Sequence, residues 1–224
     1  MSPTAPVTAP ATAPAVSSAS PTSTPRHYIN VPRDAPTVMP KHCAREGCVL
    51  SAIDEYFSVF ANHDRSEGER AEAMLLLAHW IADAHQPMHV SFADDRGGGR
   101  VDVAAGAVYR GRNMHEVWDN DVIERALGRG DWWEFARALS NTVTRAERRR
   151  WRDSSPLEWV RESHRVTVDP RTRYCRMEGD TCRSIGGARR LDAAYADYAS
   201  RVTVERIRMA GVRLARYLER GLRR

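Results

Sequence analysis

Two segments of the sequence each carry a histidine and an aspartate four positions apart. His79 and Asp83 lie in HWIADAHQPMH, and His115 and Asp119 lie in NMHEVWD. Residues at this spacing share one face of an α-helix, and both pairs stand among apolar residues, so we expect both faces to point inward. An ionised carboxylate in a core is costly unless it is paired or binds a metal. Because imidazole and carboxylate are zinc ligands, the repeated pattern predicts a metal centre.

Further histidines surround these pairs. His89 follows Pro87, which should end the first helix, so its ring can turn toward the second His–Asp pair. His27, in the earlier block RHYINVP, is another candidate ligand, whereas His85 should take no part because it has no partner at helical spacing. For each pair taken alone, a hydrogen-bonded core pair without metal is the alternative. Three histidines in polar surroundings are expected to be exposed: His42, His63 and His164.

Hydrophobic periodicity predicts helices over six ranges: 48–62, 66–86, 113–127, 130–147, 155–168 and 188–222. The second begins with a Ser-x-x-Glu capping signal, Ser66 to Glu69. Val101 and Val108 flank Ala-Ala-Gly, which predicts a short β-hairpin. The sequence therefore predicts a mainly α fold, one helical domain with a small β-hairpin excursion. Four tryptophans are expected to belong to the core: Trp80, Trp118, Trp132 and Trp133.

Composition limits the class of protein. The chain has 224 residues, enough for one domain, and 42% are hydrophobic, enough for a substantial core. Residues 1–25 contain only Met, Ser, Pro, Thr, Ala and Val, which predicts a disordered tail ahead of a domain over 26–224. The net charge of +5, carried almost entirely by arginine, suits a polyanionic partner without proving one. No run of ~18 apolar residues occurs, so no membrane span is expected.

The four cysteines form two close pairs, Cys43 with Cys48 and Cys175 with Cys182. Neither pair has the two-residue gap of a zinc knuckle or a redox motif. Short pairs of this kind favour two local disulfides and an oxidising compartment, and four free thiols in a cytosolic protein are the alternative. Residues 1–25 lack the basic start and the apolar stretch of a signal peptide.

Three sequence blocks together resemble a known family. HWIADAHQPMH, DDRGGG and NMHEVWD look like the signature blocks of the zinc-dependent, single-strand-specific nucleases of the S1/P1 type. Bacterial zinc phospholipase C is a more distant relative in the same superfamily. The match covers about residues 26–222 and implies the helical phospholipase C/P1 nuclease fold around three clustered zinc ions. The pair Cys43 and Cys48 also matches a short disulfide of the family.

The resemblance implies which residues bind zinc. One site is complete, and its ligands are His89, His115 and Asp119. A second site lacks an upstream aspartate and keeps His27, His79 and Asp83. A third retains only Asp83, because everything that the family places before RHYINVP is missing. We therefore expect one or two zinc ions, with Asp83 in the catalytic role and Asn30 near the pocket that binds the base.

The function implied by the resemblance is a zinc-dependent endonuclease that hydrolyses phosphodiester bonds of single-stranded DNA or RNA, with 3′-nucleotidase activity as a further expectation. A monomer that is secreted or periplasmic is expected. A wrongly assigned start site would explain both the missing ligands and the missing signal peptide. A truncated, inactive or weakly active remnant that still binds zinc, or an adapted two-metal enzyme, would explain the missing ligands alone.

Two other functions fit the same features. A zinc phospholipase C has the same metals and a different substrate. A basic, non-catalytic nucleic-acid-binding protein would use the stretch Arg145–Arg152, which we interpret as a solvated helix end. Chelation separates this last case, because charge-driven binding survives EDTA and weakens steeply with salt.

Overall fold

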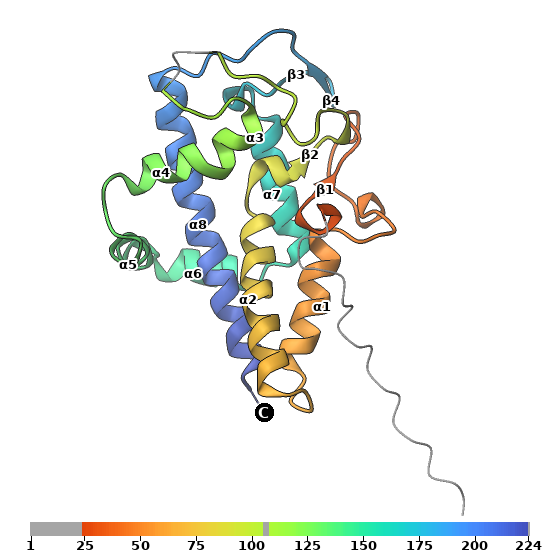
Figure 1. Ribbon diagram of the computed structural model, residues 1–224, viewed down its shortest axis with the longest axis vertical. Coiled ribbons are helices and arrows are strands. Elements are labelled where there is room, and N and C mark those ends of the chain that lie inside the picture. Colours follow the sequence, from red (N-terminus) through yellow and green to blue (C-terminus); the bar gives the residue numbers. More distant parts are fainter. Residues whose placement is uncertain (1–23, 105–107, 224) are drawn as a thin grey trace, which may run out of the picture.

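Helices α1, α2 and α8 run side by side, and the other helices pack around them (Figure 1). The computed structural model describes residues 24–104 and 108–223. Its α-helices are α1 Val49–Ala61, α2 Glu67–Asp83, α3 Met114–Glu116, α4 Val122–Leu127, α5 Trp132–Thr142, α6 Arg145–Arg152, α7 Pro156–Val168 and α8 Ala193–Gly221. Its strands form two small sheets: β1 Ile29–Asn30 with β2 Val90–Ser91, and β3 Cys175–Glu178 with β4 Thr181–Ser184. The mainly α fold is confirmed.

Helix α2 begins and ends close to the predicted positions. At its start Ser66 Oγ accepts a hydrogen bond from the N–H of Glu69, and the Glu69 carboxylate accepts one from the N–H of Ser66. The helix ends at Asp83 because the N–H groups of His85 and Gln86 bond to carbonyls three residues back, not four. Four apolar residues of the neighbouring α1 are buried, as predicted: Val49, Ile53, Tyr56 and Phe60.

The helix expected over 130–147 is two helices. Helix α5 ends at Thr142, and Thr144 then caps α6 by accepting a hydrogen bond from the N–H of Glu147. The carboxylate of Glu147 accepts a bond from the N–H of Thr144 in return. This capping box makes the arginine-rich stretch Arg145–Arg152 a helix of its own and not the end of a longer one.

The expected hairpin around Val101–Val108 is not formed by the described residues. Asp102 and Val103 make only isolated bridges, to Asn113 and Arg189, and residues 105–107 lie outside the described part. The antiparallel hairpin is β3–β4 instead, with Cys175 opposite Ser184. In both segments, 101–108 and 175–184, the alternation of apolar residues is too short for the sequence to show which of the two forms a hairpin.

Two of the four tryptophans are in the core. Trp80 and Trp118 are buried as predicted, but Trp132 is 55% and Trp133 79% exposed, so that prediction is wrong. Both lie at the start of α5, at the edge of the molecule (Figure 1), and α5 has no buried residue. Helical amphipathicity alone could not reveal that no described element covers this face.

Both predicted disulfides are present. Cys43 is bonded to Cys48 and Cys175 to Cys182, which excludes the alternative of four free thiols. Within the described residues no helix is both long enough and apolar enough to cross a membrane. The predicted tail lies outside the described residues as far as residue 23.

Candidate metal centre

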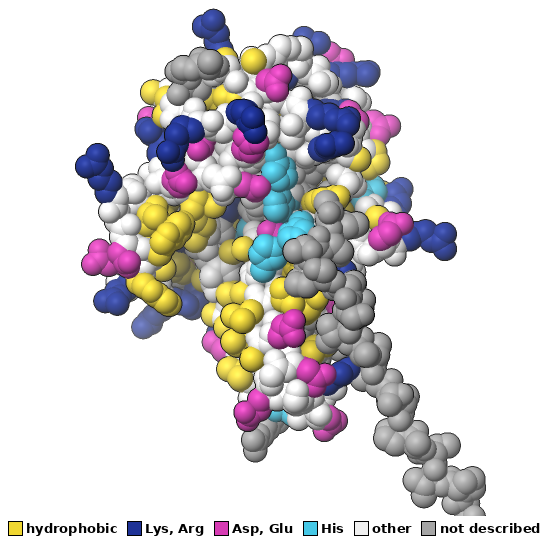
Figure 2. Space-filling view, in the orientation of Figure 1, with side chains coloured by type: hydrophobic (Ala, Val, Ile, Leu, Met, Phe, Trp, Pro, Cys, Tyr) yellow, Lys and Arg dark blue, Asp and Glu magenta, His cyan; other side chains and the backbone are white. Residues whose placement is uncertain are grey.

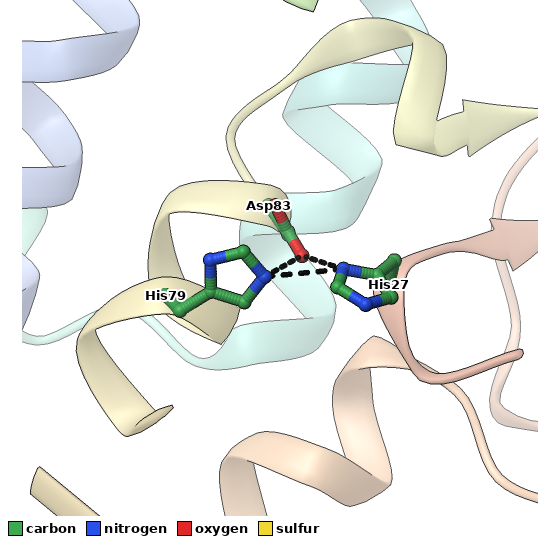
Figure 3. A group of neighbouring side chains, drawn as sticks. All are labelled: His27, His79 and Asp83. Atoms are coloured by element: carbon green, nitrogen blue, oxygen red, sulfur yellow. Dashed lines mark hydrogen bonds and ion pairs between the residues drawn. The ribbon is translucent and has the colours of Figure 1, made fainter. Parts of the chain in front are cut away.

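Three predicted ligands meet where the last turn of α2 faces the chain just before β1 (Figure 3). Nδ1 of His27 lies 2.9 Å from Oδ2 of Asp83 and 3.1 Å from Nε2 of His79. Nε2 of His79 lies 3.2 Å from the same carboxylate oxygen. These residues, called the first cluster below, therefore point their ligand atoms at one another.

The other three predicted ligands, His89, His115 and Asp119, form a second cluster. Nε2 of His89 lies 3.3 Å from Oδ1 of Asp119, and Nε2 of His115 lies 3.2 Å from Oδ2. The two imidazole rings stack with centroids 5.2 Å apart. Nδ1 of His115 donates to the carbonyl oxygen of Gly97 at 2.9 Å, which leaves the lone pair of Nε2 free to bind a metal.

A pair of two-residue strands brings the clusters together. Strands β1 and β2 are parallel, with Ile29 opposite Val90. His27 comes two residues before β1, and His89 comes directly before β2. Parallel pairing therefore places both histidines at the same end of the strands, although they are far apart in the sequence.

Asp83 and His89 connect the two clusters. Nδ1 of the buried His89 lies 3.3 Å from Oδ1 of Asp83 and makes no hydrogen bond to any described residue. Burial opposes protonation of His89, but Asp119 and Asp83 outweigh it and raise its pKa to about 9. Burial also opposes ionisation of Asp119, yet His115 and His89 hold its pKa well below the usual range. The centre thus contains one buried carboxylate, Asp83, and one partly exposed carboxylate, Asp119, and a cation beside them, either a proton or a metal, stabilises their negative charge.

The donor atoms fit zinc. Each cluster supplies two imidazole nitrogens and a carboxylate oxygen, and the ligand atoms of each lie within 4.8 Å of one another. Two ligands at the usual bond lengths of tetrahedral zinc are about 3.3 Å apart. The nearest pairs here are separated by 2.9 to 3.3 Å. Three protein ligands per cluster leave a fourth position open, as in catalytic zinc sites.

Asp119 lies in a π-helical turn, Val117–Asp121, between α3 and α4. The helix predicted over 113–127 is therefore interrupted at a predicted ligand, and such turns occur frequently at functional sites. Gln86 supports this ligand by donating from Nε2 to Oδ1 of Asp119 at 2.6 Å. Gln86 was not predicted as a site residue. The only feature of the sequence that indicates its role is its position between the predicted ligands Asp83 and His89.

A family model described as S1/P1 Nuclease matches residues 14–223. The chain belongs to the S1/P1 nuclease family. It is 34% identical to Endonuclease 2 of Arabidopsis thaliana over 114 residues, which is 46% of this chain and 39% of the relative. It is 27% identical to Nuclease S1 of Aspergillus oryzae over 212 residues, 88% of this chain and 71% of the relative. It is 29% identical to Nuclease P1 of Penicillium citrinum over 106 residues, 46% of this chain and 38% of the relative.

The family resemblance inferred from the sequence blocks is thereby confirmed. The chain spans less than two fifths of the length of Endonuclease 2 and of Nuclease P1. The predicted ligands of this S1/P1 nuclease family chain fall into the two clusters described above. Five of the six come from the blocks HWIADAHQPMH and NMHEVWD, and His27 comes from the earlier block RHYINVP.

Two hollows border the second cluster. An open pocket of about 650 Å³ is lined by Tyr28, Asn30 and Asn113 beside His115. On the other side, an apolar groove of about 360 Å³ runs between α2, α4 and α8 and opens at Asp119. Figure 2 shows the histidine side chains gathered near the centre of one face, with hydrophobic side chains beside and below them. The predicted base-binding residue Asn30 therefore lies next to the metal centre.

The remaining histidines lie outside both clusters. His85 is buried, with Nδ1 2.7 Å from the carbonyl oxygen of Ile81 and Nε2 2.7 Å from Arg213, so it is no part of the centre, as predicted. His63 is exposed as predicted, and His42 is half-buried. His164 is only 4% exposed, so its predicted exposure is wrong. The ring packs against Phe92 on the buried side of α7, where the polar neighbours Ser163 and Thr167 are buried as well.

Proposed function

We propose that this chain is a zinc-dependent endonuclease that hydrolyses phosphodiester bonds of single-stranded DNA or RNA. The observation that carries the proposal is the contact between Asp83 and His89, which joins two clusters of zinc-type ligands into one centre. Two metals held side by side suit the in-line displacement of a phosphodiester. Membership of the S1/P1 nuclease family supports the same reaction.

The proposed centre holds two zinc ions. The first cluster would bind one and the second cluster the other. When bound, zinc lowers the pKa of a water ligand toward neutrality and stabilises negative charge on a phosphate. Asp83 is the proposed catalytic residue, since one of its oxygens faces His27 and the other faces His89. Gln86 fixes the orientation of Asp119 through its side-chain amide.

The pocket beside His115 is the proposed base-binding site. Its lining includes the ring of Tyr28 and the amide of Asn30, which offer stacking and a hydrogen bond to a base edge. Stacking of one base on an aromatic ring contributes about 1–3 kcal/mol. A single strand can turn a base into this pocket, whereas a base held in a duplex is paired and stacked. This favours single-stranded substrates, with 3′-mononucleotides as a further candidate.

The two disulfides support an oxidising compartment, so we propose that the protein is secreted or periplasmic. We also propose that it acts as a monomer. Positive charge supports a nucleic-acid substrate, because the chain carries 34 Lys and Arg against 29 Asp and Glu. Many of the Lys and Arg side chains lie on the same face as the histidines, above them in Figure 2.

The proposal is tested by measuring bound zinc per chain by elemental analysis and cleavage of single-stranded DNA on the same sample. We expect two zinc ions and cleavage that EDTA abolishes. Zinc without cleavage would identify a remnant that only binds metal. Turnover of phosphatidylcholine in place of DNA would identify a phospholipase C. DNA binding that survives EDTA, without cleavage, would identify a charge-driven binding protein.

A further inference from the structure

The segment 84–90 joins Asp83 of the first cluster to His89 of the second. It follows the end of α2 and contains a 3-10 turn, Pro87–His89, and the first residue of β2. Its carbonyl groups are turned toward α7 and α8 and away from water. Carbonyls at a helix end have no partner within the helix, so other groups must satisfy them when they are buried.

Three buried side chains satisfy these carbonyls. Ser163 Oγ on α7 donates to the carbonyl oxygen of Ala84 at 2.6 Å. Thr167 Oγ1, one helical turn further, lies 2.6 Å from the carbonyl oxygen of Pro87 and 3.1 Å from that of Val90.

The third side chain comes from α8. Arg206 donates from Nε to the carbonyl oxygen of His85 at 3.2 Å and from Nη2 to Ser163 Oγ at 2.7 Å. Ser163 and Thr167 are fully buried, and Arg206 is 6% exposed, so water does not replace these contacts. These side chains thus contact the backbone between the two clusters at the carbonyl oxygens of Ala84, His85, Pro87 and Val90.

We propose that Ser163 and Thr167 are positioning residues for the metal centre. They fix the backbone between Asp83 and His89 and so set the separation of the two clusters. Neither side chain is a member of a cluster, so their effect on zinc passes through the segment 84–90. This inference rests on the proposed binding of zinc and adds two residues outside both ligand clusters.

Thr167→Val is the variant that tests the role of the hydroxyl, because valine keeps the shape and removes the donor. We expect zinc affinity, measured by competition with a coloured chelator, to fall about 10- to 100-fold, as for other residues that support metal ligands. Thr167→Ser restores the hydroxyl and should bring the affinity back near that of the parent chain. Ser163→Ala, a second variant, should also weaken zinc binding.

Thr172→Val is the matched control. Thr172 is equally buried, but its hydroxyl donates to the carbonyl oxygen of Val166 and lies 3.1 Å from the hydroxyl oxygen of Tyr198, away from segment 84–90. The Thr172→Val substitution should lower the thermal stability of the metal-free chain and leave its zinc affinity unchanged.

Three outcomes overturn the inference in distinguishable ways. Unchanged zinc affinity in both Thr167→Val and Ser163→Ala removes the positioning role and leaves the proposed function intact. An equal loss of zinc affinity in Thr172→Val would show that the weaker zinc binding of the other variants comes from general destabilisation of the fold. A parent chain that binds no zinc removes the proposed function and the positioning role together.

Discussion

Asp83 and His89 are neighbours across the boundary between two ligand clusters. Oδ1 of Asp83 lies 3.3 Å from Nδ1 of His89, while Oδ2 lies 2.9 Å from Nδ1 of His27. The other nitrogen of His89 faces Asp119 at 3.3 Å. One carboxylate and one imidazole thus serve both clusters, so a change in either residue should be felt at both proposed metal positions.

Asp83→Asn should have the largest effect of any single substitution in the centre. The amide keeps the size and removes the charge that faces all three neighbouring histidines. We expect bound zinc to fall by at least one ion per chain, and cleavage of single-stranded DNA to fall at least about 100-fold. Asp64→Asn, at an exposed carboxylate in the loop between α1 and α2, is the control and should change neither. Full zinc content in Asp83→Asn would contradict the assignment.

The two zinc ions should leave in a defined order. The histidine side chains of the first cluster, His79 and His27, are 49% and 29% exposed, whereas those of the second, His89 and His115, are 10% and 27% exposed. A chelator reaches exposed ligands more easily, so the first cluster should release its metal first. A chelator titration should show two steps, with the earlier one absent in His79→Ala and the later one absent in His115→Ala. The reverse assignment of the two variants would disprove the order.

Gly97→Ala should disturb the second cluster. The glycine has a φ of +63°, and an added Cβ would lie 2.8 Å from the carbonyl oxygen of Met88 and 3.2 Å from Nδ1 of His115. Gly179→Ala, in the turn between β3 and β4, is the control, with a φ of +59° and nothing within 4 Å of the added Cβ. We expect the control to cost about 1 kcal/mol of unfolding free energy from backbone strain alone. Gly97→Ala should cost more and also weaken zinc binding, and equal losses in the two variants would refute the steric argument.

His164 should make the metal-free chain less stable in mild acid. Burial lowers the pKa of His164 and outweighs the contact with the carbonyl oxygen of Val90, which raises it, and the charge of His42 lowers the pKa further. The unfolded chain therefore takes up a proton on this ring near pH 6.5, where the folded chain does not. The unfolding free energy should therefore fall as the pH drops below about 6.5 toward the pKa of His164 in the folded chain. The slope should reach at most about 1.4 kcal/mol per pH unit.

The contribution of His164 is measured by denaturant unfolding in EDTA between pH 7.5 and 5.5, and compared with His164→Gln. The substituted chain should show a shallower fall in unfolding free energy, because its side chain does not titrate. Parallel curves for the two chains would show that His164 is not the group responsible.

Asn30→Ala should affect substrate binding without affecting metal. Asn30 lines the pocket beside His115 but belongs to neither cluster. We expect KM for short single-stranded oligonucleotides to rise several-fold, with kcat and zinc content almost unchanged, and the preference among bases to change. A loss of zinc in this variant would show that Asn30 supports the metal centre and not the base.

The residues of the centre could be predicted from the sequence because their pattern is local. His79 with Asp83, and His115 with Asp119, are one helical turn apart, and this spacing alone puts each pair on one face. Other features were predictable because they also depend on residues that are close in the sequence: the capping box at Ser66, the buried face of α1 and the two short disulfides. The blocks that carry these residues also identified the family.

The tertiary structure decided what depends on contacts between distant segments. The parallel pairing of β1 with β2 brings His27 beside Asp83, and side chains from α7 and α8 hold the path to His89. Burial of His164 and exposure of Trp133 were predicted the wrong way round, because each depends on which element covers that face. Helical spacing fixes the direction of a side chain relative to its own helix, but only the packing of other elements determines what the side chain meets there.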